Sequence, residues 1–137
     1  MIVFDWNVRV YYEDTDAGGI VYYANYLKFF ERARTEWLRA QGIGQQQLAS
    51  SSGAMFVVRS AKIDYFSPAK LDDPLRLTLS IVKLGRASIT FEQKAWLGER
   101  VLASAQVLVA CVSVDGMRPC AIPPEVVAKI SHPEPTA

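Results

Sequence analysis

Histidine and cysteine are scarce in this sequence, with one histidine and two cysteines among 137 residues. The spacing of Cys111 and Cys120 fits no metal-ligand motif, and two cysteines are too few for a disulfide scaffold, which predicts free thiols in the reducing cytoplasm. Cys111 stands in an apolar run without a basic neighbour, so we expect its thiol to be buried and unreactive. His132 lies in a proline-containing tail, where no element would hold it in place for catalysis.

Long apolar runs and an excess of one charge are also missing. No run of 18 apolar residues occurs, which argues against a membrane span, and the N-terminal residues lack the basic start and apolar core of a secretory signal. The 15 basic and 14 acidic residues are interleaved and leave a net charge of +1, so there is no basic stripe for nucleic acid. The length and the 50% hydrophobic content predict one globular domain at 1–130 and a flexible tail at 131–137.

The hydrophobic period changes along the first third of the chain. Residues 4–12 alternate between apolar and polar, which predicts a half-buried strand, and a polar loop with two glycines follows. From Tyr22 the pattern becomes helical, with Asn25 as the expected N-cap. Phe29 falls off the apolar stripe, so we expect it to contact a second subunit. The stripe itself comprises Tyr23, Tyr26, Leu27, Phe30, Arg34, Trp37 and Leu38, with Arg34 as its only charged member.

The remainder of the chain is strand-like. Four alternating or apolar segments follow Gly53, at 57–66, 75–81, 87–95 and 101–114, and the last is apolar enough to be central. Two prolines then introduce a short terminal helix. This order predicts an α+β fold in which a curved antiparallel sheet of about five strands wraps around one long central helix. We expect the tryptophans in the core or an interface; they are Trp6, Trp37 and Trp96.

The segment 14–26 carries the features of a reactive site. A carboxylate on a glycine-containing loop that leads into a helix lies near free backbone N–H groups and the positive end of the helix dipole. Such an arrangement stabilises negative charge on a carbonyl oxygen while the carboxylate acts on the carbonyl carbon. Spacing alone favours the simpler explanation, in which Asp14, Thr15 and Asp16 are turn and cap residues of an exposed loop.

A long motif helps to distinguish a reactive from a structural role for these acidic residues. Residues 9–26 read RVYYEDTDAGGIVYYANY, and the further characteristic segments are 30–36, 56–59, 65–73, 107–114 and 117–119. Together they resemble the Tol–Pal-associated acyl-CoA thioesterases, in the 4-hydroxybenzoyl-CoA thioesterase branch of the hotdog superfamily, over nearly the whole chain. The resemblance implies the hotdog fold and hydrolysis of acyl-CoA to free acid and CoA, without a metal or a redox cofactor. The acidic residue of the family motif maps onto Asp16, as nucleophile or as general base for water, and leaves Asp14 a structural role.

One position departs from the resemblance. Members of the Tol–Pal type carry histidine at the position of Tyr23, whereas other members of the wider branch have an aromatic residue there. Tyr23 is therefore a candidate catalytic residue, with packing at the helix start as the alternative. A tyrosine, whose ordinary pKa is about 10, can donate a hydrogen bond but is a poor proton shuttle at neutral pH.

The resemblance also suggests substrate-binding positions. Gly19 belongs to the reactive loop, and a backbone N–H at Met55 or Phe56 is a candidate donor to the thioester carbonyl. Arg59 and the turn that contains Arg86 and Ser88 are candidate contacts for the phosphates of CoA, although such side chains are also common as plain surface groups.

Partners follow from the same resemblance. Similar proteins are homodimers or homotetramers whose active sites are built between two subunits. The main alternative function is a non-catalytic interaction partner of cell-envelope or lipid-synthesis components, including an acyl carrier protein. A hydratase of the same fold is disfavoured because it relies on a paired aspartate and histidine.

Overall fold

The structure is a computed structural model that describes residues 2–131. His132 and, apart from Ser131, the expected tail at 131–137 lie outside the described residues. The elements follow in the order β1 (Ile2–Arg9), a single 3-10 turn (Tyr12–Asp14), α1 (Asn25–Ala40), α2 (Gln45–Ser52), β2 (Ala54–Tyr65), β3 (Pro74–Leu84), β4 (Ser88–Leu97), β5 (Arg100–Ser113) and α3 (Pro124–Ile130).

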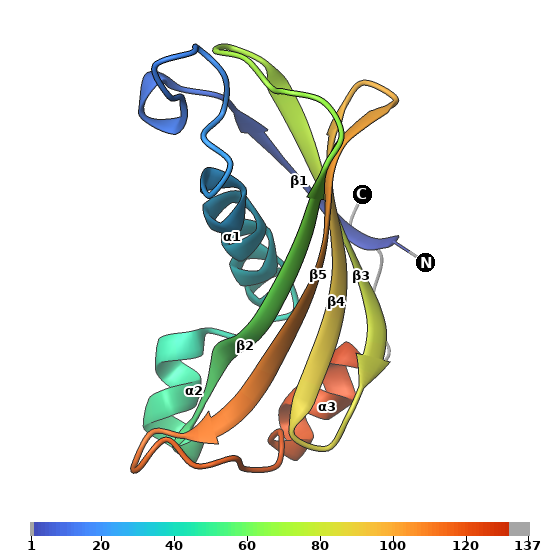
Figure 1. Ribbon diagram of the computed structural model, residues 1–137. Helices are drawn as coiled ribbons and strands as arrows, with labels where there is room; N and C mark the ends of the chain where they lie inside the picture. The colour runs from blue at the N-terminus through green and yellow to red at the C-terminus, as the bar shows by residue number, and fades with distance from the viewer. Residues whose placement is uncertain (1, 132–137) are drawn as a thin grey trace.

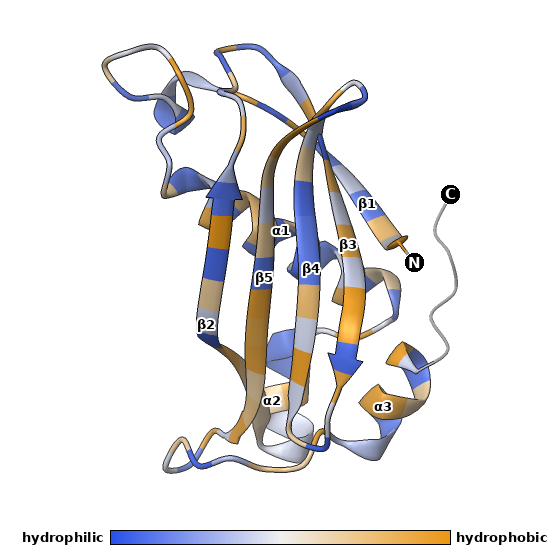
Figure 2. Cartoon of the chain, turned by 45° about the vertical axis from the view of Figure 1, so that its right-hand side comes forward, coloured by the Kyte–Doolittle hydropathy of each residue, from blue (hydrophilic) through white to orange (hydrophobic). Residues whose placement is uncertain are grey.

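A single five-stranded antiparallel sheet forms the frame of the molecule. Its spatial order is β1-β3-β4-β5-β2, and it curves around α1, which lies on its concave side (Figure 1). The predicted α+β architecture, the hotdog arrangement, is thus confirmed. β5 is apolar over most of its length and has a neighbour on each side (Figure 2), whereas β1 and β2 are the two edge strands.

The core lies between α1 and the concave face of the sheet. Phe30, Ala33 and Trp37 on α1 are fully buried, and Trp37 packs edge-on against Phe91 with 5.7 Å between ring centroids. Trp96 lies partly buried and donates its indole N–H to Thr78 Oγ1 at 2.9 Å. The residues of β3 that complete this layer alternate as a half-buried strand requires; they are Leu75, Leu77 and Leu79.

The expected position of Phe29 is wrong. Its side chain is 0% exposed and belongs to the core of its own chain, whereas Leu27, which we placed on the buried stripe, is 45% exposed. The reason is that two rows of side chains run along α1 and the sequence pattern merged them. One row, which includes Phe29, packs on the sheet, and the other, which includes Arg34, faces β2, while Leu27 lies exposed at the surface.

The N-terminus of α1 also differs from the prediction. Asn25 is the first helical residue and Ala24 occupies the N-cap position without a capping side chain. The Asn25 amide instead donates to the Asp14 carboxylate, with 2.9 Å between Nδ2 and Oδ1. The side chain that the sequence predicts to cap the helix therefore binds the buried carboxylate of Asp14 instead.

Two short helices close the other end of the molecule. No pattern in the sequence predicts α2, because its residues are polar and only Leu48 is buried. It ends at Gly53, whose φ of +67° places it in the left-handed region that favours glycine. The predicted terminal helix is confirmed as α3, where Val126 and Ile130 join the core.

Candidate active site

Asp14 holds the loop between β1 and α1 together. Its side chain is 4% exposed, and its two carboxylate oxygens accept from the Tyr11 backbone N–H at 2.8 Å and from the Asn25 amide at 2.9 Å. Its backbone carbonyl accepts from the Tyr22 N–H at 2.9 Å. A buried carboxylate is tolerated only when it is hydrogen-bonded in this way, so Asp14 ties the loop to the start of α1.

Asp16 has the opposite environment. Its side chain is exposed, and Oδ1 accepts from the Gly18 N–H at 2.8 Å, which forms a tight turn. The turn is closed by a hydrogen bond from the Gly19 N–H to the Asp16 carbonyl at 3.0 Å, with Gly19 at a φ of +80°. In the described part of the chain, Oδ2 of Asp16 has no hydrogen-bond partner and is therefore available to a ligand.

The residues just before α1 present backbone donors on the same loop as this turn. The Tyr23 carbonyl accepts from the Tyr65 hydroxyl at 2.8 Å, which fixes the peptide at this position. Among residues 2–131, no protein acceptor is found for the backbone N–H groups of Tyr23 and Ala24. These N–H groups lie at the positive end of α1, where they are suited to a developing negative charge.

Aromatic rings surround the start of α1. Tyr23 is 62% exposed and lies 4.9 Å from Tyr22 and 6.3 Å from Tyr65, measured between ring centroids. A hydrogen bond with Tyr23 raises the pKa of Tyr22, and burial raises the pKa of Tyr65, so both phenols stay neutral near pH 7. A groove of about 290 Å³ opens here; it is lined by Ile20, Val21, Tyr23, Tyr26, Tyr65, Phe66, Ser67 and Pro68.

The other candidate residues lie away from this groove in the same chain. Met55 and Phe56 stand at the opposite end of β2 from Tyr65 (Figure 1), about 30 Å away at the rise of an extended strand. Arg59 is exposed near the middle of β2. Asp16, Gly19 and Tyr23 thus belong to one loop between β1 and α1, and Tyr23 lines the groove that is far from the start of β2.

Arg86 and Ser88 lie at the end of the sheet where β2 begins. The turn between β3 and β4 is closed by a hydrogen bond from the Gly85 N–H to the Ser88 carbonyl at 2.8 Å. Ser88 pairs with Ala110 of β5, and Ala110 in turn pairs with Val57 of β2. Arg86 is exposed in this turn, so it belongs with the Met55 and Phe56 group rather than with Asp16.

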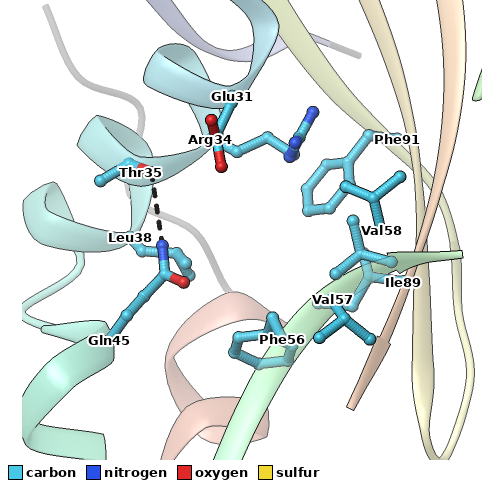
Figure 3. Close-up of a pocket in the computed structure, with 11 residues that line it drawn as sticks. Glu31, Arg34, Thr35, Leu38, Gln45, Phe56, Val57, Val58, Ile89 and Phe91 are labelled. Carbon is cyan, nitrogen blue, oxygen red and sulfur yellow. Dashed lines mark hydrogen bonds between the residues drawn. The ribbon is translucent and has the colours of Figure 1, made fainter. Parts of the chain in front are cut away.

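A second cavity, of about 340 Å³, lies between α1, α2 and the sheet (Figure 3). Its helical wall is polar apart from Leu38, and its sheet wall is apolar. It shares no lining residue with the groove at Tyr23. The lining residues are Glu31, Arg34, Thr35 and Gln45 from the helices, with Leu38, Phe56, Val57, Val58, Ile89, Phe91 and Val109.

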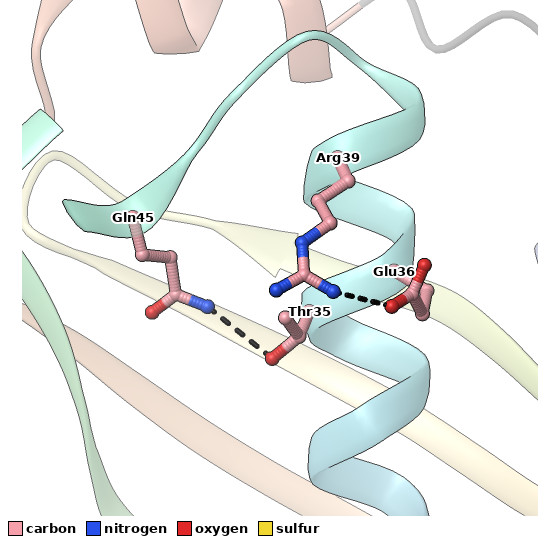
Figure 4. A network of polar contacts seen from close by, with 4 residues as sticks. All are labelled: Thr35, Glu36, Arg39 and Gln45. Atoms are coloured by element: carbon pink, nitrogen blue, oxygen red, sulfur yellow. Dashed lines mark hydrogen bonds and ion pairs between the residues drawn. The ribbon is translucent and has the colours of Figure 1, made fainter. Parts of the chain in front are cut away.

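The polar wall of this cavity is partly satisfied within the chain. Gln45 donates from Nε2 to Thr35 Oγ1 at 3.3 Å, while Arg39 turns away and pairs with Glu36 (Figure 4). Arg34 reaches across toward Phe91 (Figure 3). Our sequence reasoning did not assign Arg34 to a site, although a lone charge on an apolar stripe was the signal that marked it.

Within residues 2–131, no three His, Cys, Asp or Glu side chains are placed to share a metal ion. None of the helices described is both long and apolar enough to span a bilayer.

Comparison with known proteins gives consistent matches. Residues 18–104 match the sequence model of the thioesterase superfamily. The chain is 49% identical over 129 residues to the acyl-CoA thioesterase YbgC of Haemophilus influenzae, covering 94% of this chain and 95% of that protein. It is 47% identical to the acyl-CoA thioester hydrolase YbgC of an Escherichia coli O6:H1 strain, covering 95% and 97%. The crystal structure of a probable thioesterase from Bartonella henselae superposes with a TM-score of 0.85 at 38% identity, covering 90% and 100%.

Proposed function

Because this chain belongs to the thioesterase superfamily and is a thioester hydrolase, we propose that it cleaves acyl-CoA with water to give a free carboxylic acid and CoA. The two relatives that match it over nearly their whole length carry the names acyl-CoA thioesterase and acyl-CoA thioester hydrolase. The observation that carries the proposal is an exposed Asp16 carboxylate with a free oxygen on the same loop as the unpaired N–H groups before α1.

Asp16 acts on the thioester in one of two ways. Either its Oδ2 adds to the acyl carbon and forms a mixed anhydride that water then opens, or Oδ2 takes a proton from a water that attacks the same carbon. In both routes CoA leaves as the thiolate and takes up a proton. The hydrogen bond from Gly18 to Oδ1 fixes the carboxylate so that the second oxygen points free of the turn.

The carbonyl oxygen of the thioester needs donors as it becomes negative. The Tyr23 and Ala24 N–H groups have no protein acceptor and sit at the helix start, so they supply these donors. The Tyr65 hydroxyl holds the Tyr23 peptide in place through the Tyr23 carbonyl. The Tyr23 side chain then contributes ring packing and not proton transfer, in keeping with its phenolic chemistry.

A second copy of the chain completes the site. Among residues 2–131, β2 is an edge strand whose outer backbone groups pair with no other strand. Two copies that pair through β2 about a two-fold axis run antiparallel, so the Phe56 end of one strand lies beside the Tyr65 end of the other. This arrangement joins the groove at Tyr23 of one subunit to the larger cavity of the next, as a homodimer or as half of a homotetramer.

The remaining candidates serve CoA and the carbonyl at this junction. Met55 and Phe56 bring backbone N–H groups to the subunit boundary, and Arg86 and Ser88 offer donors to the phosphates at the adjacent sheet end. Arg59 lies on β2 between Phe56 and Tyr65. We place the reaction in the cytoplasm, where Cys111 and Cys120 stay as the free thiols that the structure contains.

The direct test is thiol release from a panel of acyl-CoA thioesters. Purified protein and its Asp16→Asn variant are compared with a thiol-detecting reagent, with circular dichroism as the control for folding. Release by the parent that is lost in the variant supports the enzyme and the role of Asp16. If the parent releases no thiol from any acyl-CoA, a non-catalytic partner of acyl-carrier or cell-envelope components of the Tol–Pal type becomes the better account.

A further inference from the structure

Arg34 is a charged side chain whose donors are mostly unused. It lines the larger cavity, and Nη1 donates to Gln93 Oε1 at 2.9 Å. A guanidinium carries five N–H groups, and within residues 2–131 this is its one hydrogen bond to protein. No carboxylate lies within ion-pair distance of it in the same part of the chain. Burial lowers the pKa of Arg34 while the charge of Glu31 counteracts this, but an arginine stays protonated near pH 7.

Gln93 holds the guanidinium in a fixed position. Its side chain is 0% exposed on β4, and its Nε2 donates to the Phe30 carbonyl at 2.9 Å. That bond orients the amide so that Oε1 faces Arg34. This single hydrogen bond to the buried Gln93 amide holds the guanidinium in the cavity. Its other N–H groups remain available to a ligand bound there.

The residues that line the cavity indicate which chemical groups its ligand carries. The sheet side offers Phe56, Ile89 and Phe91, which suit a hydrocarbon, and the helix side offers the unused donors of Arg34. A volume of about 340 Å³ is at the small end of the range for ligand pockets, so the ligand is a short chain or a single ring. A purely hydrocarbon ligand would leave those donors without water or acceptor, which is costly.

We propose that this cavity binds the acyl group of the thioester and that Arg34 donates hydrogen bonds to an oxygen atom carried by that group. The inference rests on the proposed function and adds a specificity-determining residue to it. Acyl groups that bear a hydroxyl or a carboxylate are therefore better substrates than the unsubstituted chain of the same length. Glu31 lines the same cavity and distinguishes the two oxygens, since its carboxylate accepts from a hydroxyl but repels a second carboxylate.

The test compares acyl groups of equal length. The substrates are hexanoyl-CoA, β-hydroxyhexanoyl-CoA, ω-hydroxyhexanoyl-CoA and adipoyl-CoA, and the variants are Arg34→Met, Arg34→Lys and the exposed Arg32→Met on the same helix as a matched control. In the parent we expect at least one oxygenated substrate to exceed hexanoyl-CoA in kcat/KM. In Arg34→Met that ratio falls by roughly 10- to 100-fold, the worth of a charge-assisted hydrogen bond. Arg34→Lys retains part of the ratio, and Arg32→Met retains all of it.

Glu31→Gln separates the two oxygen sources. If a hydroxyl is the acceptor, this variant lowers the ratio for the hydroxyacyl substrates, and if a carboxylate is the acceptor, it raises the ratio for adipoyl-CoA. The proposal is overturned if the parent and Arg34→Met show the same ratio for every oxygenated substrate, a result that leaves thioester hydrolysis itself untouched.

Binding provides a readout that does not depend on turnover. Uncleavable S-alkyl thioethers of CoA, with and without a terminal hydroxyl or carboxylate, are titrated into the parent and Arg34→Met by calorimetry. If no acyl-CoA is hydrolysed, the proposed function fails, yet an oxygen-dependent affinity that disappears in Arg34→Met still supports the cavity. Equal affinities in both proteins overturn it. Thermal unfolding of Arg34→Met, compared with that of the parent, tests whether a change in fold causes the effect. If Arg34→Met does not fold, Arg34→Lys takes its place in the same measurements.

Discussion

The Asn25 side-chain amide donates to the Asp14 carboxylate, with 2.9 Å between Nδ2 and Oδ1, and both side chains are buried. This bond joins the end of the 3-10 turn that follows β1 to the first residue of α1. It fixes which of the two loop aspartates is structural, because Asp14 has no accessible oxygen left while Asp16, two residues on, keeps one.

Removal of the Asp14 carboxylate tests this division. We expect Asp14→Ala to lower the free energy of unfolding by about 2 to 3 kcal/mol, since the Asn25 amide and the Tyr11 N–H lose their acceptor in a buried place. Urea unfolding measures it, and a double-mutant cycle with Asn25→Ala gives a coupling energy well above zero. A loss below about 0.5 kcal/mol would contradict the structural role.

Asp16→Asn is predicted to separate activity from stability. The asparagine oxygen still accepts from the Gly18 N–H, so the turn survives and the free energy of unfolding changes by less than about 0.5 kcal/mol. The rate of thioester cleavage falls by about 100-fold or more, because an amide neither attacks the acyl carbon nor takes a proton from water. Steady-state kinetics and thermal unfolding on one preparation check both halves.

The two tyrosines beside the site are predicted to contribute differently. Tyr65→Phe removes the hydroxyl that holds the Tyr23 carbonyl, so kcat falls by about 3- to 10-fold as the backbone donors become less well placed. Tyr23→Phe keeps the ring packing and the backbone N–H, so its kcat stays within about threefold of the parent. A larger loss in Tyr23→Phe than in Tyr65→Phe would instead assign the Tyr23 hydroxyl to the chemistry.

The subunit arrangement is tested at the β2 edge. Ala61→Glu places a charge on an exposed position of this strand, and pairing of two copies would bring two such carboxylates close together. We expect a shift to the monomer in sedimentation and a parallel loss of hydrolysis. Asn7→Glu, at an exposed position of the opposite edge strand β1, is the matched control and should change neither.

Cys111 is predicted to resist alkylation in the folded protein. Burial, with a contribution from the neighbouring Cys120 thiol 3.7 Å away, raises its pKa to about 12, so the reactive thiolate is nearly absent at pH 8. Because the folded pKa exceeds that of the unfolded chain, the linked stability is intact at neutral pH and is lost as the pH rises from about 9 toward 12. Mass spectrometry after iodoacetamide treatment in Cys120→Ser follows the first effect, and unfolding between pH 8 and 10 follows the second. Rapid labelling of native Cys111 would contradict the burial.

Local sequence patterns were sufficient for the architecture. The alternation in 4–12, the change of period at Tyr22 and the turn signals after Gly53 specify strand, helix and four further strands, and the sheet confirms that order. Such patterns succeed because the backbone geometry of a strand or a helix sets the spacing of the side chains on each face, and the backbone geometry of a turn favours particular residues. The motif around Asp16 likewise marked the loop, since glycines and short acidic residues are needed there for the turn.

Which side chains are hydrogen-bonded and which remain free depends on the packing of the folded chain. A helical period does not reveal that the sheet curves around α1, so it misplaced Phe29 and Leu27; nor does it show that Asn25 turns toward Asp14 instead of capping. α2 is held by its neighbours and not by its own polar sequence. The position of Arg34 against Gln93, 59 residues along the chain, depends on a contact between a helix and a strand. Contacts of that kind arise from packing, which no local pattern encodes.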